Sequence, residues 1–215
     1  MSKKYEIFLF DLDGTITDSA LGITNSVMYA LKKFGIEETD RTKLYKFIGP
    51  PLTESFEKFY GFTKEQSLDG VKYYREYYHD KGIYENRVYD GLEEVLKKIN
   101  EAGKQAIVAT SKPEKYAKII IDHFHLTQYF ACVAGMEMDG GRGTKAQVIT
   151  YALEKNDITD KSNVLIGDRE HDVIGAHENG LDCLGILYGF GSRKEFEEAG
   201  ADYIRENVED ILQFV

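Results

Sequence analysis

Two pairs of aspartates follow two short apolar runs of the chain. Asp11 and Asp13 come directly after Ile7–Phe10, and Asp168 and Asp172 come after the run at residues 164–166. Strand geometry puts Asp11 and Asp13 on one side, and helix geometry puts Asp172 one turn beyond Asp168. Close carboxylates ionise together only beside a cation, and Mg²⁺ prefers oxygen ligands. The sequence therefore predicts a magnesium site, against the simpler alternatives of an Asp-Gly turn and a helix-capping acid.

Two other segments have the composition of an anion site. The second predicted strand ends in Thr110-Ser111-Lys112-Pro113, and a helix is expected to begin there. Hydroxyls, free backbone N–H groups and the positive end of a helix together favour phosphate. The loop Gly140–Lys145 is rich in glycine, but its spacing is not that of a P-loop. An ordinary Ser/Thr helix cap and a surface turn are the alternatives for these two segments.

Apolar runs and helical patterns alternate along most of the chain. The runs lie at residues 7–10, 105–109, 131–134, 164–166 and 183–187. Continuous apolar runs of this length are typical of buried parallel strands, and strands that alternate with helices predict an α/β fold. We expect a doubly wound, Rossmann-like parallel sheet. The ligand crevice of such a sheet lies at the carboxyl ends of the strands, which is where the aspartates fall.

One long segment interrupts this alternation. Ile23, Val27 and Leu31 share a helical face, and two further helices are expected at about residues 53–60 and 64–81. We therefore predict a helical cap of residues 17–86, inserted into a discontinuous α/β core of residues 1–16 and 87–215.

Composition excludes several classes of partner. The chain has 215 residues and a net charge of −10, and no basic stripe offsets this charge, so we expect no nucleic-acid polymer. No apolar stretch is long enough to span a membrane, and the first apolar run is too short for a signal peptide. We expect a cytoplasmic protein without a membrane partner. Nothing in the sequence indicates its oligomeric state.

The ordered set of motifs resembles the haloacid dehalogenase superfamily of phosphatases. The motifs are Asp11-Leu12-Asp13-Gly14-Thr15, Thr110, Lys145 and Gly167-Asp168-Arg169-Glu170-His171-Asp172. An insert between the first two motifs is similar to the cap of the phosphoglycolate-phosphatase branch. The loop Gly140–Lys145, the run Val148–Leu153 and the segment Tyr188–Ser192 are similar to the 5′-nucleotidase-like members of that branch.

The resemblance implies a role for each matching residue. Asp11 would be the nucleophile, and Asp13 would be the general acid and base that also offers its backbone carbonyl to Mg²⁺. Thr110 and the Ser111 amide would hold phosphate oxygens. The remaining roles would be charge neutralisation by Lys145, metal ligation by Asp168, and fixing of Lys145 or a metal-bound water by Asp172. Relatives often have a proline near the third-motif lysine and this chain has none there, so Lys112 remains an alternative to Lys145.

The implied activity is the Mg²⁺-dependent hydrolysis of a small phosphorylated metabolite through an aspartyl-phosphate. One alternative is a phosphomutase of the same superfamily, although mutases typically carry a cap histidine at the position where this chain has Ile23. A second alternative is a non-catalytic phospho-acceptor module, although such modules are shorter and lack a helical insert. The identity of the leaving group is not encoded in a readable pattern.

Overall fold

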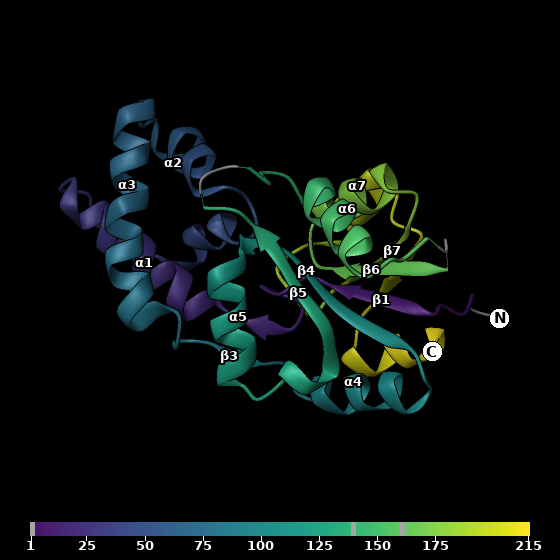
Figure 1. The fold of residues 1–215 in the computed structure, drawn as a ribbon. Helices are drawn as coiled ribbons and strands as arrows, with labels where there is room; N and C mark the ends of the chain where they lie inside the picture. The colour runs from purple at the N-terminus through teal and green to yellow at the C-terminus, as the bar shows by residue number, and fades with distance from the viewer. Residues whose placement is uncertain (1–2, 139–140, 160–161) are drawn as a thin grey trace. The chain divides into compact units, whose positions relative to one another are not determined.

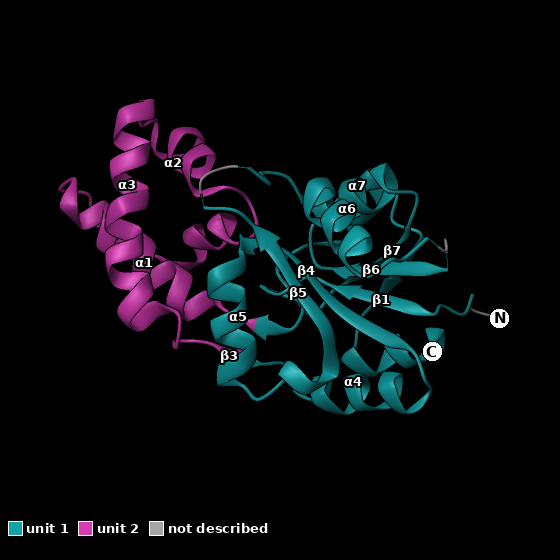
Figure 2. Ribbon diagram, viewed as in Figure 1, with its two compact units in different colours: residues 1–17, 88–215 teal, residues 18–87 magenta. Residues whose placement is uncertain are grey.

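A computed structural model describes residues 3–138, 141–159 and 162–215. The chain divides into two compact units, one of residues 1–17 with 88–215 and one of residues 18–87 (Figure 2). The two strands β2 (Thr17–Asp18) and β3 (Arg87–Val88) pair where the chain passes from one unit to the other. No helix within the described residues is long and apolar enough to cross a membrane.

The larger unit is built on a parallel sheet of six strands, which confirms the predicted α/β fold (Figure 1). The strands are β1 (Ile7–Phe10), β4 (Gln105–Pro113), β5 (Phe130–Met136), β6 (Asn163–Gly167), β7 (Asp182–Ile186) and β8 (Tyr203–Arg205). Their order is β5-β4-β1-β6-β7-β8, and every neighbouring pair is parallel. This order sets the carboxyl end of β1 between those of β4 and β6.

Helices cover both faces of this sheet, as a doubly wound fold requires. They are α4 (Leu92–Glu101), α5 (Glu114–His123), α6 (Lys145–Lys155), α7 (Glu170–Glu178) and α8 (Arg193–Ala199), with short helices η3 (Thr127–Tyr129) and η4 (Val208–Phe214). Figure 1 shows α6 and α7 over one face and α4 over the other.

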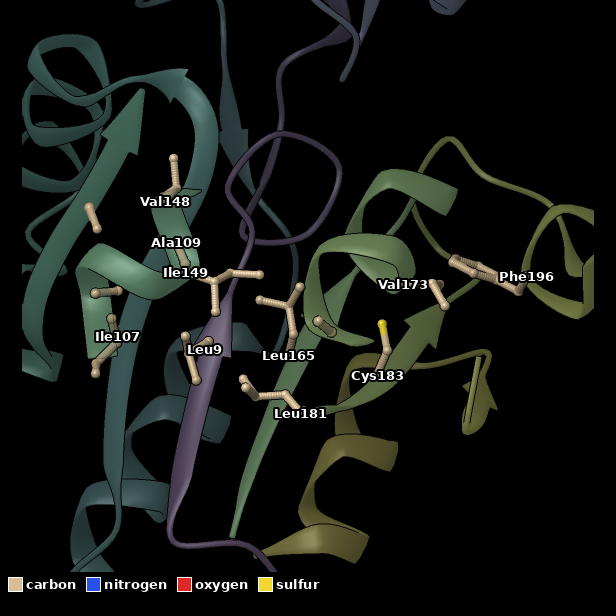
Figure 3. Close-up of a cluster of buried hydrophobic side chains, with 13 residues drawn as sticks. Leu9, Ile107, Ala109, Val148, Ile149, Leu165, Val173, Leu181, Cys183 and Phe196 are labelled. Carbon is tan, nitrogen blue, oxygen red and sulfur yellow. The ribbon is translucent and has the colours of Figure 1, made fainter. Parts of the chain in front are cut away.

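Strand periodicity divides the core between the two faces. Leu9 and Leu165 point to the face of α6 and α7, where they pack with Ile149 and Val173 (Figure 3). The ring of Phe10 instead packs against the ring of Phe130, with centroids 6.1 Å apart. Burial on both faces explains why β1, β4, β5, β6 and β7 contain continuous apolar runs rather than alternating ones.

The smaller unit is helical. It contains α1 (Ala20–Lys33), η1 (Arg41–Phe47), α2 (Leu52–Tyr60), α3 (Lys64–Tyr77) and the π-helical turn η2 (Tyr78–Gly82). The single helix expected at residues 64–81 is thus an α-helix followed by a π turn. Tyr74 and Tyr78 are buried and their rings stack, so they belong to the core of this unit.

Candidate active site

The loop after β1 places two buried aspartates at the carboxyl edge of the sheet. Asp11 and Asp13 are 6% and 8% exposed. The backbone N–H of Asp11 donates to the carbonyl oxygen of Ile166 at 2.9 Å, so this residue continues the pairing of β1 with β6. The chain then turns at Gly14, whose φ of +84° lies in the left-handed region that favours glycine. The register with β6 thus places Asp11 at the carboxyl edge of the sheet, and Asp13 follows it in the turn.

Lys145 joins the first and fourth motifs through ion pairs. Its Nζ lies 2.6 Å from Oδ1 of Asp11 and 2.7 Å from Oδ1 of Asp172. It also donates to the carbonyl oxygen of Ala109, in the middle of β4, at 2.9 Å. Burial alone lowers the pKa of Lys145, but the attraction of Asp11 and Asp172 outweighs it and the pKa is raised. The ammonium group is therefore charged at physiological pH.

Local structure around α6 explains how Lys145 reaches this position. Thr144 and Gln147 form a capping box that makes Lys145 the first helical residue. In the preceding loop, Arg142 forms ion pairs with Glu114 at 3.0 Å and with Glu137 at 2.7 Å. Gly140, part of the glycine-rich loop singled out above, lies outside the described residues. The described end of that loop is therefore anchored by Arg142.

A glycine that sequence reasoning missed makes room for Lys145. A Cβ atom at Gly175, inside α7, would lie 2.6 Å from Cγ of Lys145. Glycine in the interior of a helix costs about 1 kcal/mol relative to alanine, so its presence there is a signal of close packing. The stem of Lys145 lies directly over the backbone of α7 because Gly175 has no side chain.

Three buried carboxylates form a group with the composition of a cation site. Oxygens of Asp11, Asp168 and Asp172 all lie within 4.8 Å of one another. Oδ2 of Asp168 accepts a hydrogen bond from the Phe190 backbone N–H at 2.8 Å, whereas the buried Oδ1 has no hydrogen-bond partner within the described part of the chain. An orphaned buried carboxylate oxygen beside two more carboxylates is the arrangement that a hard divalent cation satisfies.

The charge balance of the site also favours a bound cation. Four buried carboxylates (Asp11, Asp13, Asp168 and Asp172) face two buried ammonium groups (Lys112 and Lys145), an excess of two negative charges. In the metal-free protein, burial raises the pKa of Asp11 to about 6 against the attraction of Lys145. Burial, with repulsion from Asp172 and Asp11, raises the pKa of Asp168 well above its usual value. The residues present therefore fit Mg²⁺.

Asp13 and Lys112 form a second buried ion pair. Nζ of Lys112 lies 2.6 Å from Oδ2 of Asp13. The carboxylate of Asp13 is outside the group of three described above. The two lysines that the sequence left as alternatives thus have different partners: Lys145 contacts Asp11 and Lys112 contacts Asp13.

The end of β4 lies where the sequence predicts it, and it rules out the alternative of an ordinary Ser/Thr helix cap. The strand continues to Pro113, and α5 begins at Glu114 without a side-chain cap. Thr110 and Ser111 are therefore strand residues and do not cap the helix. Thr110 is 1% exposed, and its Oγ1 accepts from the backbone N–H of Lys112 at 3.1 Å. Pairing with β5 as far as Met136 keeps the chain extended here.

The family follows from comparison with known proteins. Over residues 8–186 the chain matches the family described as haloacid dehalogenase-like hydrolase, and it belongs to that family. The resemblance predicted from the motifs is confirmed.

Individual relatives refine this assignment. A 5′-nucleotidase of Pseudomonas aeruginosa is 44% identical over 192 residues, which cover 89% of this chain and 87% of the relative. The crystal structure of a predicted phosphatase from Clostridium acetobutylicum has a TM-score of 0.94 and 47% identity, with 98% of each chain covered. The chain is a phosphatase of the haloacid dehalogenase-like family.

A third relative carries a different activity. The tyrosine-protein kinase PtkA of Mycobacterium tuberculosis is 36% identical over 186 residues, which cover 86% of this chain and 63% of that protein. Because more than a third of PtkA has no counterpart in the match, kinase activity is not carried over to this chain.

Proposed function

We propose that the protein is a Mg²⁺-dependent phosphomonoester hydrolase that acts on a small phosphorylated metabolite through an aspartyl-phosphate on Asp11. The observation that carries the proposal is the contact of Lys145 with Asp11 and Asp172, beside the orphaned oxygen of Asp168. A nucleophilic carboxylate, a fixed positive charge and a cation site then lie at one edge of the sheet. Phosphoryl transfer depends on this combination of positioning and charge neutralisation.

The chemistry divides between the two aspartates of the first motif. A carboxylate oxygen of Asp11 attacks phosphorus, and the bond from phosphorus to the leaving oxygen breaks. Asp13 gives a proton to the leaving oxygen and later takes one from the water that attacks the aspartyl-phosphate. That attack releases inorganic phosphate and restores Asp11. Thr110 and the Ser111 amide hold phosphate oxygens in this scheme.

The proposed metal site combines residues of the first and fourth motifs. Asp11, Asp168 and the backbone carbonyl of Asp13 would hold Mg²⁺, which when bound supplies neutralising charge to the phosphoryl group. The role of Asp172 in the proposal is to orient Lys145, because its Oδ1 pairs with that ammonium group while its Oδ2 accepts from the Arg169 backbone N–H at 3.0 Å. Selection of the leaving group is assigned to residues 18–87, as the resemblance implies for an inserted cap.

Among substrates we place nucleoside 5′-monophosphates first and phosphoglycolate second. The 5′-nucleotidase relative is 44% identical to this chain, against 20% for a phosphoglycolate phosphatase of Vibrio parahaemolyticus, which supports this order. Phosphate release from a panel of phosphorylated metabolites, with Mg²⁺ and with EDTA, tests the proposal. We expect multiple turnovers that stop in EDTA and return with excess Mg²⁺. Stoichiometric release, or full activity in excess chelator, would contradict it.

A phosphomutase would instead return the phosphoryl group to its substrate. Ile23 stands at the position where mutases place a histidine, and it is 4% exposed within the smaller unit. We expect β-glucose 1-phosphate in the same panel to yield no more glucose 6-phosphate than inorganic phosphate. The reverse ratio would favour the mutase.

Asp168→Asn is expected to stabilise the metal-free protein while removing its response to Mg²⁺. The raised pKa of Asp168 means that its ionised form destabilises the fold above the ordinary aspartate range. In EDTA near neutral pH, the neutral amide should raise Tm by about 2–6 °C. This gain should vanish as pH falls to about 4, where the carboxyl is protonated in wild type as well.

Thermal unfolding with and without Mg²⁺ measures both effects. Mg²⁺ should raise the Tm of wild type and leave that of Asp168→Asn nearly unchanged. The exposed Asp69, in α3, provides a matched control, because Asp69→Asn should alter neither value. A lower Tm for Asp168→Asn in EDTA would mean that the Asp168 carboxylate is stabilised by the site itself.

A further inference from the structure

The segment that follows β7 touches both strand ends of the site. The hydroxyl of Tyr188 donates to the carbonyl oxygen of Thr15 at 3.1 Å, in the loop after β1. Two residues later, the backbone N–H of Phe190 donates to Oδ2 of Asp168 at 2.8 Å, after β6. The segment Tyr188–Gly191 is thus hydrogen-bonded to the loop that carries Asp11 and Asp13 and to the fourth-motif aspartate.

Two glycines bring the backbone of this segment against Asp168. A Cβ atom at Gly189 would lie 2.4 Å from Cβ of Asp168 and 2.4 Å from the carbonyl oxygen of Gly14. A Cβ atom at Gly191 would lie 1.9 Å from the carbonyl oxygen of Asp168. These separations are far inside van der Waals contact, so a side chain at either position would push Asp168 away or open the segment.

This packing leaves the two oxygens of Asp168 in different situations. Oδ2 is held by the Phe190 N–H, and Oδ1 is buried with no hydrogen-bond partner in the described chain. Asp168 as a whole is 1% exposed, so its carboxylate has little room to turn. The orientation of the carboxylate is therefore set by the backbone of Tyr188–Gly191 and not by Asp168 alone.

We infer that Tyr188–Gly191 is a positioning segment for the metal site: it presents Oδ1 of Asp168 to the cation and fixes the loop of Gly14 and Thr15 against that acid. The inference rests on the magnesium site proposed above. Groups that orient a metal ligand typically contribute about 10- to 100-fold to metal affinity. Displacement of the segment should therefore weaken Mg²⁺ binding before any substrate is present.

Calorimetric titration of the full-length, substrate-free protein with Mg²⁺ tests this inference. Gly189→Ala is expected to raise the Kd for Mg²⁺ at least about tenfold. Gly185→Ala is the matched control, because its Cβ atom would crowd Phe196 at 2.6 Å instead of Asp168. The control should lower Tm and keep the wild-type Kd, which separates loss of positioning from loss of stability.

A milder variant decides the case if Gly189→Ala does not fold. Tyr188→Phe removes only the hydroxyl that bonds Thr15 and should weaken Mg²⁺ binding about two- to tenfold. Wild-type protein that takes up no Mg²⁺ would contradict the proposed magnesium site. If wild type binds Mg²⁺ tightly and folded Gly189→Ala binds it equally tightly, only the role of the segment is overturned. If Gly189→Ala does not fold, an unchanged Kd for Mg²⁺ in Tyr188→Phe has the same meaning.

Discussion

Asp11→Asn is expected to lower kcat by at least about 10⁴-fold, the scale seen when a nucleophile is removed from a covalent mechanism. An amide keeps the shape of the carboxylate but does not attack phosphorus. Lys145 keeps its ion pair with Asp172 and its bond to the Ala109 carbonyl, so the fold should survive the change. The loss should therefore lie in kcat, with an unfolding transition as cooperative as that of wild type.

The proposed aspartyl-phosphate can be detected directly by trapping it on the protein. Rapid acid quenching during turnover of a radiolabelled substrate should leave label on the wild-type protein, and hydroxylamine should release it, as for an acyl phosphate. Asp11→Asn should carry no label. The exposed Asp122, in α5, provides the control, because Asp122→Asn should label and turn over like wild type. Substantial turnover by homogeneous Asp11→Asn would eliminate the aspartyl-phosphate mechanism.

Lys145→Ala is expected to cost about 10²-fold or more in kcat/KM, and more than Lys112→Ala. Nζ of Lys145 contacts both Asp11 and Asp172, and in the proposed mechanism it neutralises both the nucleophile and the incoming phosphoryl group. Lys112 instead contacts Asp13, whose proposed role is proton transfer. The two losses should thus differ in size because the two lysines have different partners.

Stability measurements complete this comparison. Lys145→Ala leaves Asp11 and Asp172 buried without their shared cation, and removal of one partner from a buried pair costs about 3–5 kcal/mol. Mg²⁺ should recover part of this loss. Rates must therefore be compared on folded, Mg²⁺-saturated samples, with the exposed Lys115→Ala as control. Equal losses, or a larger loss for Lys112→Ala, would exchange the roles assigned to the two lysines.

Local sequence determined most of the elements of the larger unit. Strands buried on both faces must be apolar throughout, so β1, β4, β5, β6 and β7 are all visible as apolar runs. The strand β8 was not predicted, because Tyr203–Arg205 is short, half-buried and lies at the edge of the sheet. The end of β4 at Pro113 was predicted as well, whereas its pairing with β5 as far as Met136 is a tertiary contact.

The sequence by itself also determined which acids could act together. Asp11 and Asp13 are fixed by strand spacing, and Asp168 and Asp172 by one helical turn, so each pair is a local property. Only the tertiary structure decided which lysine connects Asp11 with Asp172. Lys145 is 134 residues from Asp11 and reaches it because β1 lies between β4 and β6 while Gly175 admits its stem. The hydrogen bond from the Phe190 backbone N–H to Asp168 could not be predicted from the sequence either. Every residue except proline has a backbone N–H group, so only the tertiary packing determines which acceptor it contacts.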